Sequence, residues 1–257
     1  MANFCLMIQY DGTRYNGWQR QGNTADTIQG KLEAILLQLY GEPVDLNGSG
    51  RTDAGVHALR QIANYRIPRM LSRHSCSQIQ EYFNQYLPQD IRVLAVEKAP
   101  ERFHARLSAT SKIYEYRIDC GAVANIFDRR YLLRIEEPLN IEKMKEAASY
   151  LIGTHDFKSF CTEKPEVTNT VRTIYSLNVI REGDMIIIRV TGNGFLYNMV
   201  RIIAGTLIRV GGGFIEPQQI KKILEAKDRT LAGETARPEG LTLIGIRYGG
   251  NIQGERM

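Results

Sequence analysis

The chain has 257 residues, of which 43% are hydrophobic and 24% charged, the composition of an ordinary globular protein. Its four cysteines are widely spaced and form no CxxC pair, which argues against a disulfide framework or a zinc site. The longest apolar stretch, 195–210, is interrupted by Arg201 and Arg209 and is too short to cross a membrane. The first ten residues lack the basic segment and cleavage site of a signal peptide. We therefore expect a cytoplasmic protein with no membrane partner.

The charge balance is basic, because 33 lysines and arginines face 28 aspartates and glutamates. Such a balance is compatible with a polyanionic partner, since Lys and Arg release counterions from phosphates when they bind nucleic acid. The excess is modest, and many basic proteins bind no nucleic acid. Charge alone therefore supports an RNA partner and its absence about equally.

Hydrophobic periodicity and turn residues predict a chain of alternating strands and helices. In chain order the predicted elements are strand 3–10, helix 26–40, a short strand before residue 47, strand 61–67, helix 77–87, strand 91–98, a strand through 114–120, helix 140–151, strands 171–180 and 185–191, helix 196–210, helix 217–226 and strand 241–248. The helix at 140–151 starts on an Asn cap and has Gly153 just past its end.

Each half of the chain mixes strands with at least two helices, and the probable hairpin at 171–191 favours antiparallel pairing. This pattern predicts an α+β fold of two related subdomains, residues 1–105 and 106–257, with mainly antiparallel mixed sheets flanked by helices. No internal sequence repeat supports duplication.

The densest motif is residues 48–57, in which three glycines surround Arg51 and Asp53. Glycine lets the backbone turn sharply and approach a ligand closely. The spacing fits neither common phosphate-binding loop, because Asp53 stands at the third glycine position and no Gly-Lys-Ser/Thr follows. An aspartate in a Gly-rich loop is usually a turn former. Arg51 makes this one unusual, since a guanidinium fork suits both a carboxylate and a phosphate.

Four ordered blocks of the sequence resemble one family. They are Tyr-Asp-Gly-Thr-Arg-Tyr-Asn-Gly-Trp-Gln at 10–19, Gly-Arg-Thr-Asp-Ala-Gly-Val-His at 50–57, Phe-His-Ala-Arg-Leu-Ser-Ala-Thr-Ser-Lys-Ile-Tyr-Glu-Tyr at 103–116 and Gly-Asn-Gly-Phe-Leu-Tyr-Asn-Met-Val-Arg-Ile-Ile-Ala-Gly at 192–205. The second block closely resembles the active-site motif of the TruA family of tRNA pseudouridine synthases, whose aspartate is the nucleophile. The likeness runs from about residue 4 to 248, with departures at Arg60 and Asn64. It implies the pseudouridine synthase fold, with a basic active-site cleft between the subdomains.

The resemblance assigns roles to three residues. Asp53 becomes the catalytic nucleophile and Arg201 its ion-pair partner, which keeps a buried carboxylate ionised. Tyr114 becomes the residue that stacks on the target uracil, with a hydroxyl able to help move the C5 proton. Taken alone, the alternation of Tyr114 and Tyr116 favours aromatic packing on a sheet face, and Arg201 resembles a solvated arginine on a helix edge.

The remaining site predictions concern the substrate. We expect Arg51 to fill the space of a flipped base and to hold phosphates, and Arg14 and Arg20 to contact RNA. His57 and His104 are interpreted as structural. No histidine pair has metal-ligand spacing, so the sequence predicts no metal, and an isomerisation requires no cofactor.

The implied activity is isomerisation of uridine to pseudouridine at positions 38–40 in the anticodon stem-loop of tRNA, with base flipping, by a homodimeric enzyme. Whether Asp53 attacks uracil C6 or ribose C1′ stays open. The first alternative is a non-catalytic RNA-binding protein or RNA chaperone, although such a chain would be expected to have lost Asp53 or Arg201. The second, a phosphate-binding metabolic enzyme, lacks the lysine or ribose-binding acid that it needs.

Overall fold

The computed structural model describes residues 1–162 and 168–249, and it divides into two compact units. Unit 1 consists of Met1–Thr110 together with the chain from Leu243 onward, and unit 2 consists of Ser111–Thr242. Each unit is described by itself.

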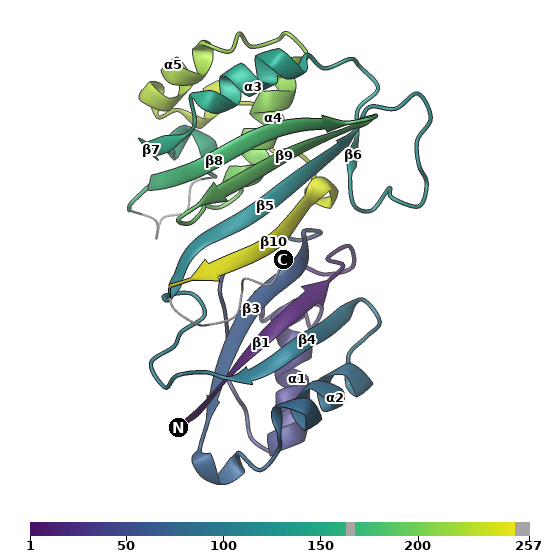
Figure 1. Cartoon of the computed structure of the whole chain (residues 1–257), viewed down its shortest axis with the longest axis vertical. Coiled ribbons are helices and arrows are strands. Elements are labelled where there is room, and N and C mark those ends of the chain that lie inside the picture. Colours follow the sequence, from purple (N-terminus) through teal and green to yellow (C-terminus); the bar gives the residue numbers. More distant parts are fainter. Residues whose placement is uncertain (163–167, 250–257) are drawn as a thin grey trace. The chain divides into compact units, whose positions relative to one another are not determined.

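Unit 1 is built on four main strands in the order β4-β1-β3-β10, with the short strand β2 paired to β3 (Figure 1). Their bounds are β1 Ala2–Tyr10, β2 Leu46–Gly48, β3 His57–Ile67, β4 Ile91–Lys98 and β10 Leu241–Tyr248. The pairs β1–β3, β1–β4 and β2–β3 are antiparallel. Strand β1 is central and apolar, so most of its side chains are buried.

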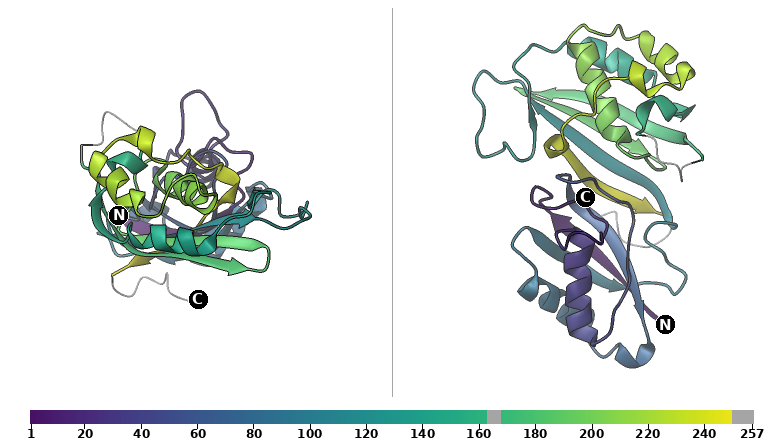
Figure 2. Two further views of the ribbon diagram at one scale, coloured as in Figure 1. Left: turned by 90° about the horizontal axis from the view of Figure 1, so that it is seen from above. Right: turned by 180° about the vertical axis from the view of Figure 1, so that it is seen from behind.

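Two helices cover one face of these strands, as the rear view in Figure 2 shows for α1. Helix α1 spans Ile28–Tyr40, begins at the Thr27 cap, whose hydroxyl accepts from Gly30 N at 3.2 Å, and ends at Gly41. Helix α2 spans Cys76–Tyr86 and begins with a capping box. A short 3₁₀ turn, Arg69–Leu71, precedes it. The core between strands and helices contains Phe4, Leu6, Ile8, Leu32, Leu36 and Phe83, all fully buried.

Unit 2 has the strand order β5-β9-β8-β7, with β6 paired to β5. The bounds are β5 Ala109–Asp119, β6 Leu133–Arg134, β7 Gly153–Asp156, β8 Val171–Glu182 and β9 Met185–Gly192. Only the short β5–β6 pair is parallel among the pairings described, and the pairs β5–β9, β9–β8 and β8–β7 are antiparallel. The prediction of an α+β fold with mainly antiparallel strands is therefore confirmed.

Three helices belong to unit 2: α3 Ile141–Ser149, α4 Met199–Gly211 and α5 Gln219–Ala226, with 3₁₀ turns at Lys158–Phe160, Arg229–Leu231 and Pro238–Gly240. Helix α4 is the most apolar, and Ile202, Ile203 and Leu207 are fully buried. Helix α3 packs against β8 and α4. The Asn140 cap is confirmed, because its side chain accepts from Lys143 N at 3.0 Å.

The differences from the predicted elements lie at ends and in short strands. The third helix stops at Ser149 instead of 151, because Gly153, with φ of 113°, opens β7 and is not a helix cap. The fourth helix starts at Met199, three residues later than predicted, after Asn198 in the left-handed conformation. No helix among the described residues has the length and apolarity needed to cross a membrane.

Candidate active site

The loop between β2 and β3 carries Asp53 and is held by backbone hydrogen bonds at both ends. Ser49 N donates to Ile62 O at 2.8 Å, which extends the β2–β3 pairing into the loop. At the other end Val56 N donates to Asp53 O at 3.1 Å and closes a four-residue turn. Gly55, at the third position of that turn, has φ of 78°, a conformation that glycine adopts without strain. Asp53 therefore stands at the first position of a tight turn.

A second loop, residues 11–27, packs directly on this one. Trp18 N donates to Thr52 O at 3.0 Å, and Gly55 N donates to Tyr15 O at 3.3 Å. A Cβ atom on Gly17 would lie 2.7 Å from Thr52 O, and one on Gly12 would lie 2.0 Å from Val56 O. The two backbones therefore approach so closely that only glycine fits at these positions. Two of the four family-like blocks are thus in contact.

The side chains of the Asp53 loop alternate between protein and solvent. Arg51 is exposed, Thr52 is buried and Asp53 is half-buried. Thr52 Oγ1 lies 2.8 Å from the hydroxyl of Tyr10. Arg51 Nε donates to Gln19 Oε1 at 2.9 Å, so its side chain is tethered to the other loop. The loop directs Arg51 and Asp53 outward by anchoring the residue between them.

His57 also connects the two loops. It is buried, and its Nδ1 accepts from Gly12 N at 3.0 Å while lying 3.2 Å from Asp11 Oδ1. This contact agrees with the interpretation of His57 as a structural residue of the loop. This partner could not be predicted from the sequence, since Gly12 is 45 residues away.

The two arginines expected to contact RNA are both exposed and both paired with carboxylates. Arg14 donates to Asp90 Oδ2 through Nε and Nη2 at 2.9 and 2.6 Å, and the hydrogen bond and charge of Asp90 raise the pKa of Arg14. Arg20 Nη1 lies 3.0 Å from Glu33 Oε2. An RNA phosphate would therefore share each guanidinium with a protein carboxylate.

In unit 2, Tyr114 lies on β5 opposite Val190 of β9. Its ring is buried and makes an edge-to-face contact with Phe195, with centroids 5.3 Å apart. Tyr116, two residues on, is fully buried, and its hydroxyl donates to Arg237 O at 2.7 Å. Burial raises the pKa of Tyr116 well above its ordinary value. Tyr116 is therefore a core residue, and Tyr114 stays the tyrosine for which the family resemblance predicts a site role.

Arg201 lies in the first turn of α4 and is half-buried. Its Nε donates to Ala236 O at 2.7 Å and its Nη1 donates to Asn198 Oδ1 at 3.1 Å, while Ala236 N donates back to Arg201 O at 3.1 Å. The guanidinium is thus oriented from two sides. Asn198, which the sequence did not single out, orients Arg201; the signal for it is an asparagine just before a helix, a residue type that tolerates the left-handed conformation seen there.

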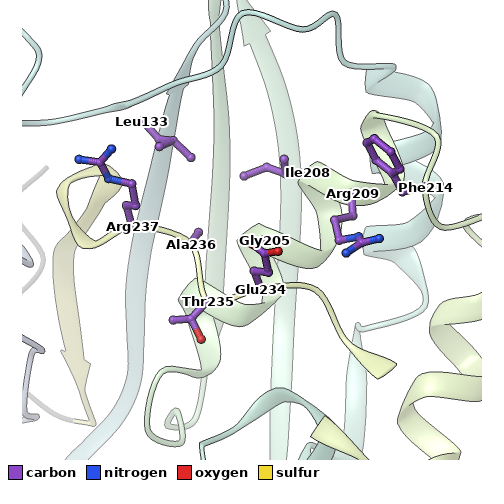
Figure 3. A pocket seen from close by; sticks show the side chains of 9 residues that line it. All are labelled: Leu133, Gly205, Ile208, Arg209, Phe214, Glu234, Thr235, Ala236 and Arg237. Carbon is purple, nitrogen blue, oxygen red and sulfur yellow. The ribbon is translucent and has the colours of Figure 1, made fainter. Parts of the chain in front are cut away.

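The same segment 233–237 lines a cavity of about 450 Å³ beside α4 (Figure 3). Gly205 makes the packing possible, because a Cβ atom there would lie 1.9 Å from Glu234 O. At one side Arg209 lies over the ring of Phe214, 5.5 Å from its centroid. The cavity lining is Leu133, Gly205, Ile208, Arg209, Phe214, Glu234, Thr235, Ala236 and Arg237.

The predicted site residues are divided between the units. Unit 1 contains Asp53 with Arg51, Arg14 and Arg20, and unit 2 contains Tyr114 and Arg201. Within the described residues, no three His, Cys, Asp or Glu side chains are grouped as metal ligands would be. Asp53 and the two residues predicted to act with it, Arg201 and Tyr114, therefore belong to different units.

Comparison with known proteins defines the class. The model of the tRNA pseudouridine synthase family matches residues 6–107 and 147–249, and the chain belongs to this family. Both matched segments contain site residues, Asp53 in the first and Arg201 in the second.

Close relatives cover nearly the whole chain. Similar proteins are tRNA pseudouridine synthase A 2 of Bacillus cereus strain ZK / E33L, 45% identical, and tRNA pseudouridine synthase A of Bacillus sp. strain KSM-64, 47% identical, each over 96% of this chain and 100% of the relative. A tRNA pseudouridine synthase A of Thermoanaerobacter sp. strain X514 is 46% identical, again over 96% of this chain and 100% of the relative. A chain in the crystal structure of a Cbf5-Nop10-Gar1 complex aligns over 80% of this chain and 45% of its own length with 13% identity, but its TM-score of 0.34 is too low to support an argument.

Proposed function

We propose that this chain isomerises uridine to pseudouridine in tRNA, at positions 38–40 of the anticodon stem-loop, with Asp53 as the nucleophile. The carrying observation is the loop that presents Asp53: a turn fixed at both ends, with the neighbouring side chain anchored in the protein. Full-length identity of 45% to a tRNA pseudouridine synthase A supports the substrate class. The activity makes the chain an isomerase of the cytoplasm.

The reaction breaks the N-glycosidic bond, turns the uracil and joins its C5 to the ribose. It needs a nucleophilic carboxylate, a cation that keeps this carboxylate charged, and a group that helps to move the C5 proton. Asp53 supplies the first, Arg201 the second and Tyr114 the third. Atoms and electrons are conserved between uridine and pseudouridine, so the reaction requires no external oxidant, reductant or group donor.

Arg201 is suited to its role by the two contacts that orient it. Ala236 O and Asn198 Oδ1 accept from Nε and Nη1, so the guanidinium is held in one orientation, in which we propose that it meets a further acceptor. A fixed cation stabilises a carboxylate more than a flexible one, because less side-chain freedom is lost when the pair forms. In the proposed complex that acceptor is the carboxylate of Asp53.

A stacked uridine must leave the stem before it reacts, and flipping it out costs a few kcal/mol. Arg51 is exposed beside Asp53, so we assign to it the space that the flipped base leaves. Arg14 and Arg20 are assigned to the phosphates of the anticodon arm, and the enzyme is expected to act as a homodimer. A non-catalytic RNA-binding protein remains the alternative, and the presence of both Asp53 and Arg201 favours the enzyme.

Release of tritium from tRNA carrying [5-³H]uridine tests the proposal, because C5 loses its hydrogen only when the new bond forms. We expect turnover with wild-type protein on unmodified tRNA and a loss of at least about 10³-fold in Asp53→Asn, which keeps size and removes the nucleophilic charge. The tRNA affinity of the variant should stay close to that of wild type. Turnover in Asp53→Asn near the wild-type rate would show that another residue is the nucleophile. Binding without turnover by wild type would favour the RNA-binding alternative.

A further inference from the structure

The amide of Gln61, on β3 beneath the Asp53 loop, is fully buried and uses all of its hydrogen-bonding capacity. Its Oε1 accepts from Ser49 Oγ at 2.7 Å and from Ile62 N at 3.2 Å. Its Nε2 donates to Gly50 O at 3.0 Å and toward the hydroxyl of Tyr10 at 3.5 Å. A primary amide has two acceptor positions and two N–H donors, so every one is satisfied. A network of this completeness has a defined geometry.

Tyr10 is the next member of this network. It is the last residue of β1 and is 3% exposed. Burial raises the pKa of Tyr10 to about 12, against smaller opposite effects of its hydrogen bonds, so the hydroxyl is protonated at neutral pH. Because its oxygen accepts from Gln61, its proton is available to Thr52 Oγ1, 2.8 Å away. The contacts therefore run from Gln61 to Tyr10 to Thr52, and either hydroxyl can donate in the Tyr10–Thr52 bond.

A β-bulge places Tyr10 where it can make this contact. In the β1–β3 pair, Ile8 lies opposite Gln61, but Tyr10 lies opposite Ala58, so β3 has one extra residue between these positions. Bulges re-aim side chains and occur beside active sites. Tyr10 and Gln61 thereby meet under the loop, although 51 residues separate them in the chain.

Thr52 transmits this contact to the nucleophile. It is buried between exposed Arg51 and half-buried Asp53, so its side chain is the inward anchor of three consecutive residues. Its backbone carbonyl is held separately by Trp18 N. Rotation of Thr52 would turn the adjoining peptide and move the Asp53 carboxylate. A displacement of about 1 Å in a reacting group is enough to cost about 100-fold in rate.

We propose that Tyr10 is a positioning residue of the reaction, which directs the Asp53 carboxylate by fixing Thr52 through the hydrogen-bond chain from Gln61. The inference rests on the proposed function, since it takes Asp53 as the nucleophile. Tyr10 itself touches no substrate in this proposal. Its hydroxyl acts through Thr52 alone.

The competing explanation is that the Tyr10 hydroxyl stabilises the fold and nothing more. Tyr65 is the matched control, because it is also a fully buried tyrosine of unit 1 with a hydroxyl partner, Tyr40 Oη at 3.0 Å. Tyr65→Phe removes an equivalent buried hydroxyl outside the Asp53 loop. A purely structural role predicts that the two Phe variants behave alike in the enzymatic assay.

The experiment measures single-turnover tritium release from a tRNA substrate at saturating full-length enzyme, together with the Kd for tRNA and the thermal midpoint of each variant. Tyr10→Phe is expected to lower the single-turnover rate by about 10- to 100-fold with Kd changed less than about two-fold. Tyr65→Phe should lower the thermal midpoint comparably and keep the wild-type rate. The loss in Tyr10→Phe should be the same at every pH, since no charge near Asp53 is altered. A wild-type rate in Tyr10→Phe, or an equal loss in both variants, overturns the proposal.

A double-mutant cycle tests whether the effect passes through Thr52. Thr52→Val keeps the shape and removes the hydroxyl, and it should lose as much rate as Tyr10→Phe. Thr52→Ser, which keeps the hydroxyl, should lose less than Thr52→Val. The combined variant should show about the loss of either single variant, because both changes break one hydrogen bond. Losses that multiply would show that Tyr10 does not act through Thr52. If wild type itself lacks turnover, the proposed function fails, whereas an active wild type with an unaffected Tyr10→Phe refutes only this inference.

Discussion

The two halves of the candidate site hold their key side chains by different physical means. Asp53 lies on a loop without regular secondary structure, fixed by hydrogen bonds from Gln61, Tyr10 and the backbone of a second loop. Arg201 lies on α4, a helix whose inner face is packed in an apolar core, and hydrogen bonds with Ala236 and Asn198 orient its guanidinium. Polar networks are directional and fail abruptly when one member is lost, whereas apolar packing is tolerant of small changes.

This difference suggests that the Asp53 loop contributes geometry to the candidate site and that helix α4 contributes charge. The loop determines where the carboxylate points, because each of its anchors is a directional bond. Helix α4 is rigid and determines the position of the Arg201 guanidinium. In the proposed site the contribution of this cation is electrostatic. Variants of the loop should therefore change the rate without changing its pH dependence, and variants at Arg201 should change both.

After removal of the nucleophile itself, the largest effect is expected for Arg201→Met. A carboxylate that loses its neighbouring cation has a raised pKa, and because only the ionised form is nucleophilic, the rising limb of the pH–rate profile should move to higher pH. At neutral pH the single-turnover rate should fall by about 10²- to 10³-fold, equally on tRNA and on an unpaired oligonucleotide. Arg209→Met is the control, since Arg209 is exposed at the other end of α4 and stacks on Phe214. An unshifted profile in Arg201→Met would contradict the ion pair.

A pair of glycine variants compares the two means of support directly. Gly12→Ala places a Cβ atom 2.0 Å from Val56 O, and Gly205→Ala places one 1.9 Å from Glu234 O, so both force backbone apart. We expect each to lower the free energy of unfolding by about 1–3 kcal/mol in thermal denaturation. Gly22→Ala, which meets nothing within 4 Å, is the control. Under conditions where both variants are folded, Gly12→Ala should lower the single-turnover rate more than Gly205→Ala. The opposite order would contradict the proposed difference between the loop and the helix.

Arg51→Met separates a role in base flipping from a role in charge. If Arg51 occupies the space of the flipped base, the rate should fall about 10-fold on a uridine in a stem and little on one in an unpaired loop, because unstacking costs less there. The pH profile should stay in place. A stem-selective defect in Arg201→Met with a pH shift in Arg51→Met would mean that the two roles are reversed.

The smallest effect is expected for Arg14 and Arg20. Each phosphate contact contributes about one unit to the slope of log K against log salt, so the double Ala variant should lower the slope by up to about two. Their pairing with Asp90 and Glu33 reduces the expected loss of affinity, since each cation is partly neutralised already. Lys143→Ala with Lys145→Ala, two lysines of α3 that pair with glutamates, is the matched control, with Lys145 exposed and Lys143 half-buried. Equal slopes in both double variants would exclude the 11–27 loop as an RNA contact.

Much of the fold could be predicted because its signals are local. Strands β4 and β10 have the predicted bounds, and the cap of α3 is the predicted Asn140. These features depend on alternation, periodicity and capping within a few residues. Strand β6, with two residues, and β7, with four, were missed because so short a segment carries no periodic signal.

The motifs of the candidate site could be predicted from the sequence, but its side-chain contacts could be predicted less well. The sequence identified the Asp53 loop and the α4 helix from local blocks that resemble a family. It did not reveal that Tyr10 meets Gln61 or that Arg14 meets Asp90, because these partners are 51 and 76 residues apart. Long-range pairs of this kind depend on strand register, which a single bulge changes.

The order of the units along the chain has a consequence for folding during synthesis. Unit 2 is a continuous stretch, whereas unit 1 is interrupted, and its last strand, β10, leaves the ribosome after all of unit 2. The unit that carries Asp53 therefore stays incomplete until β10 has been synthesised. Thr110 and Arg247, on either side of the insertion, are joined by a hydrogen bond of 3.0 Å from Thr110 Oγ1 to Arg247 O. A nascent chain released early, before residue 241, would lack this strand, so it would carry Asp53 on a set of strands from which β10 is missing.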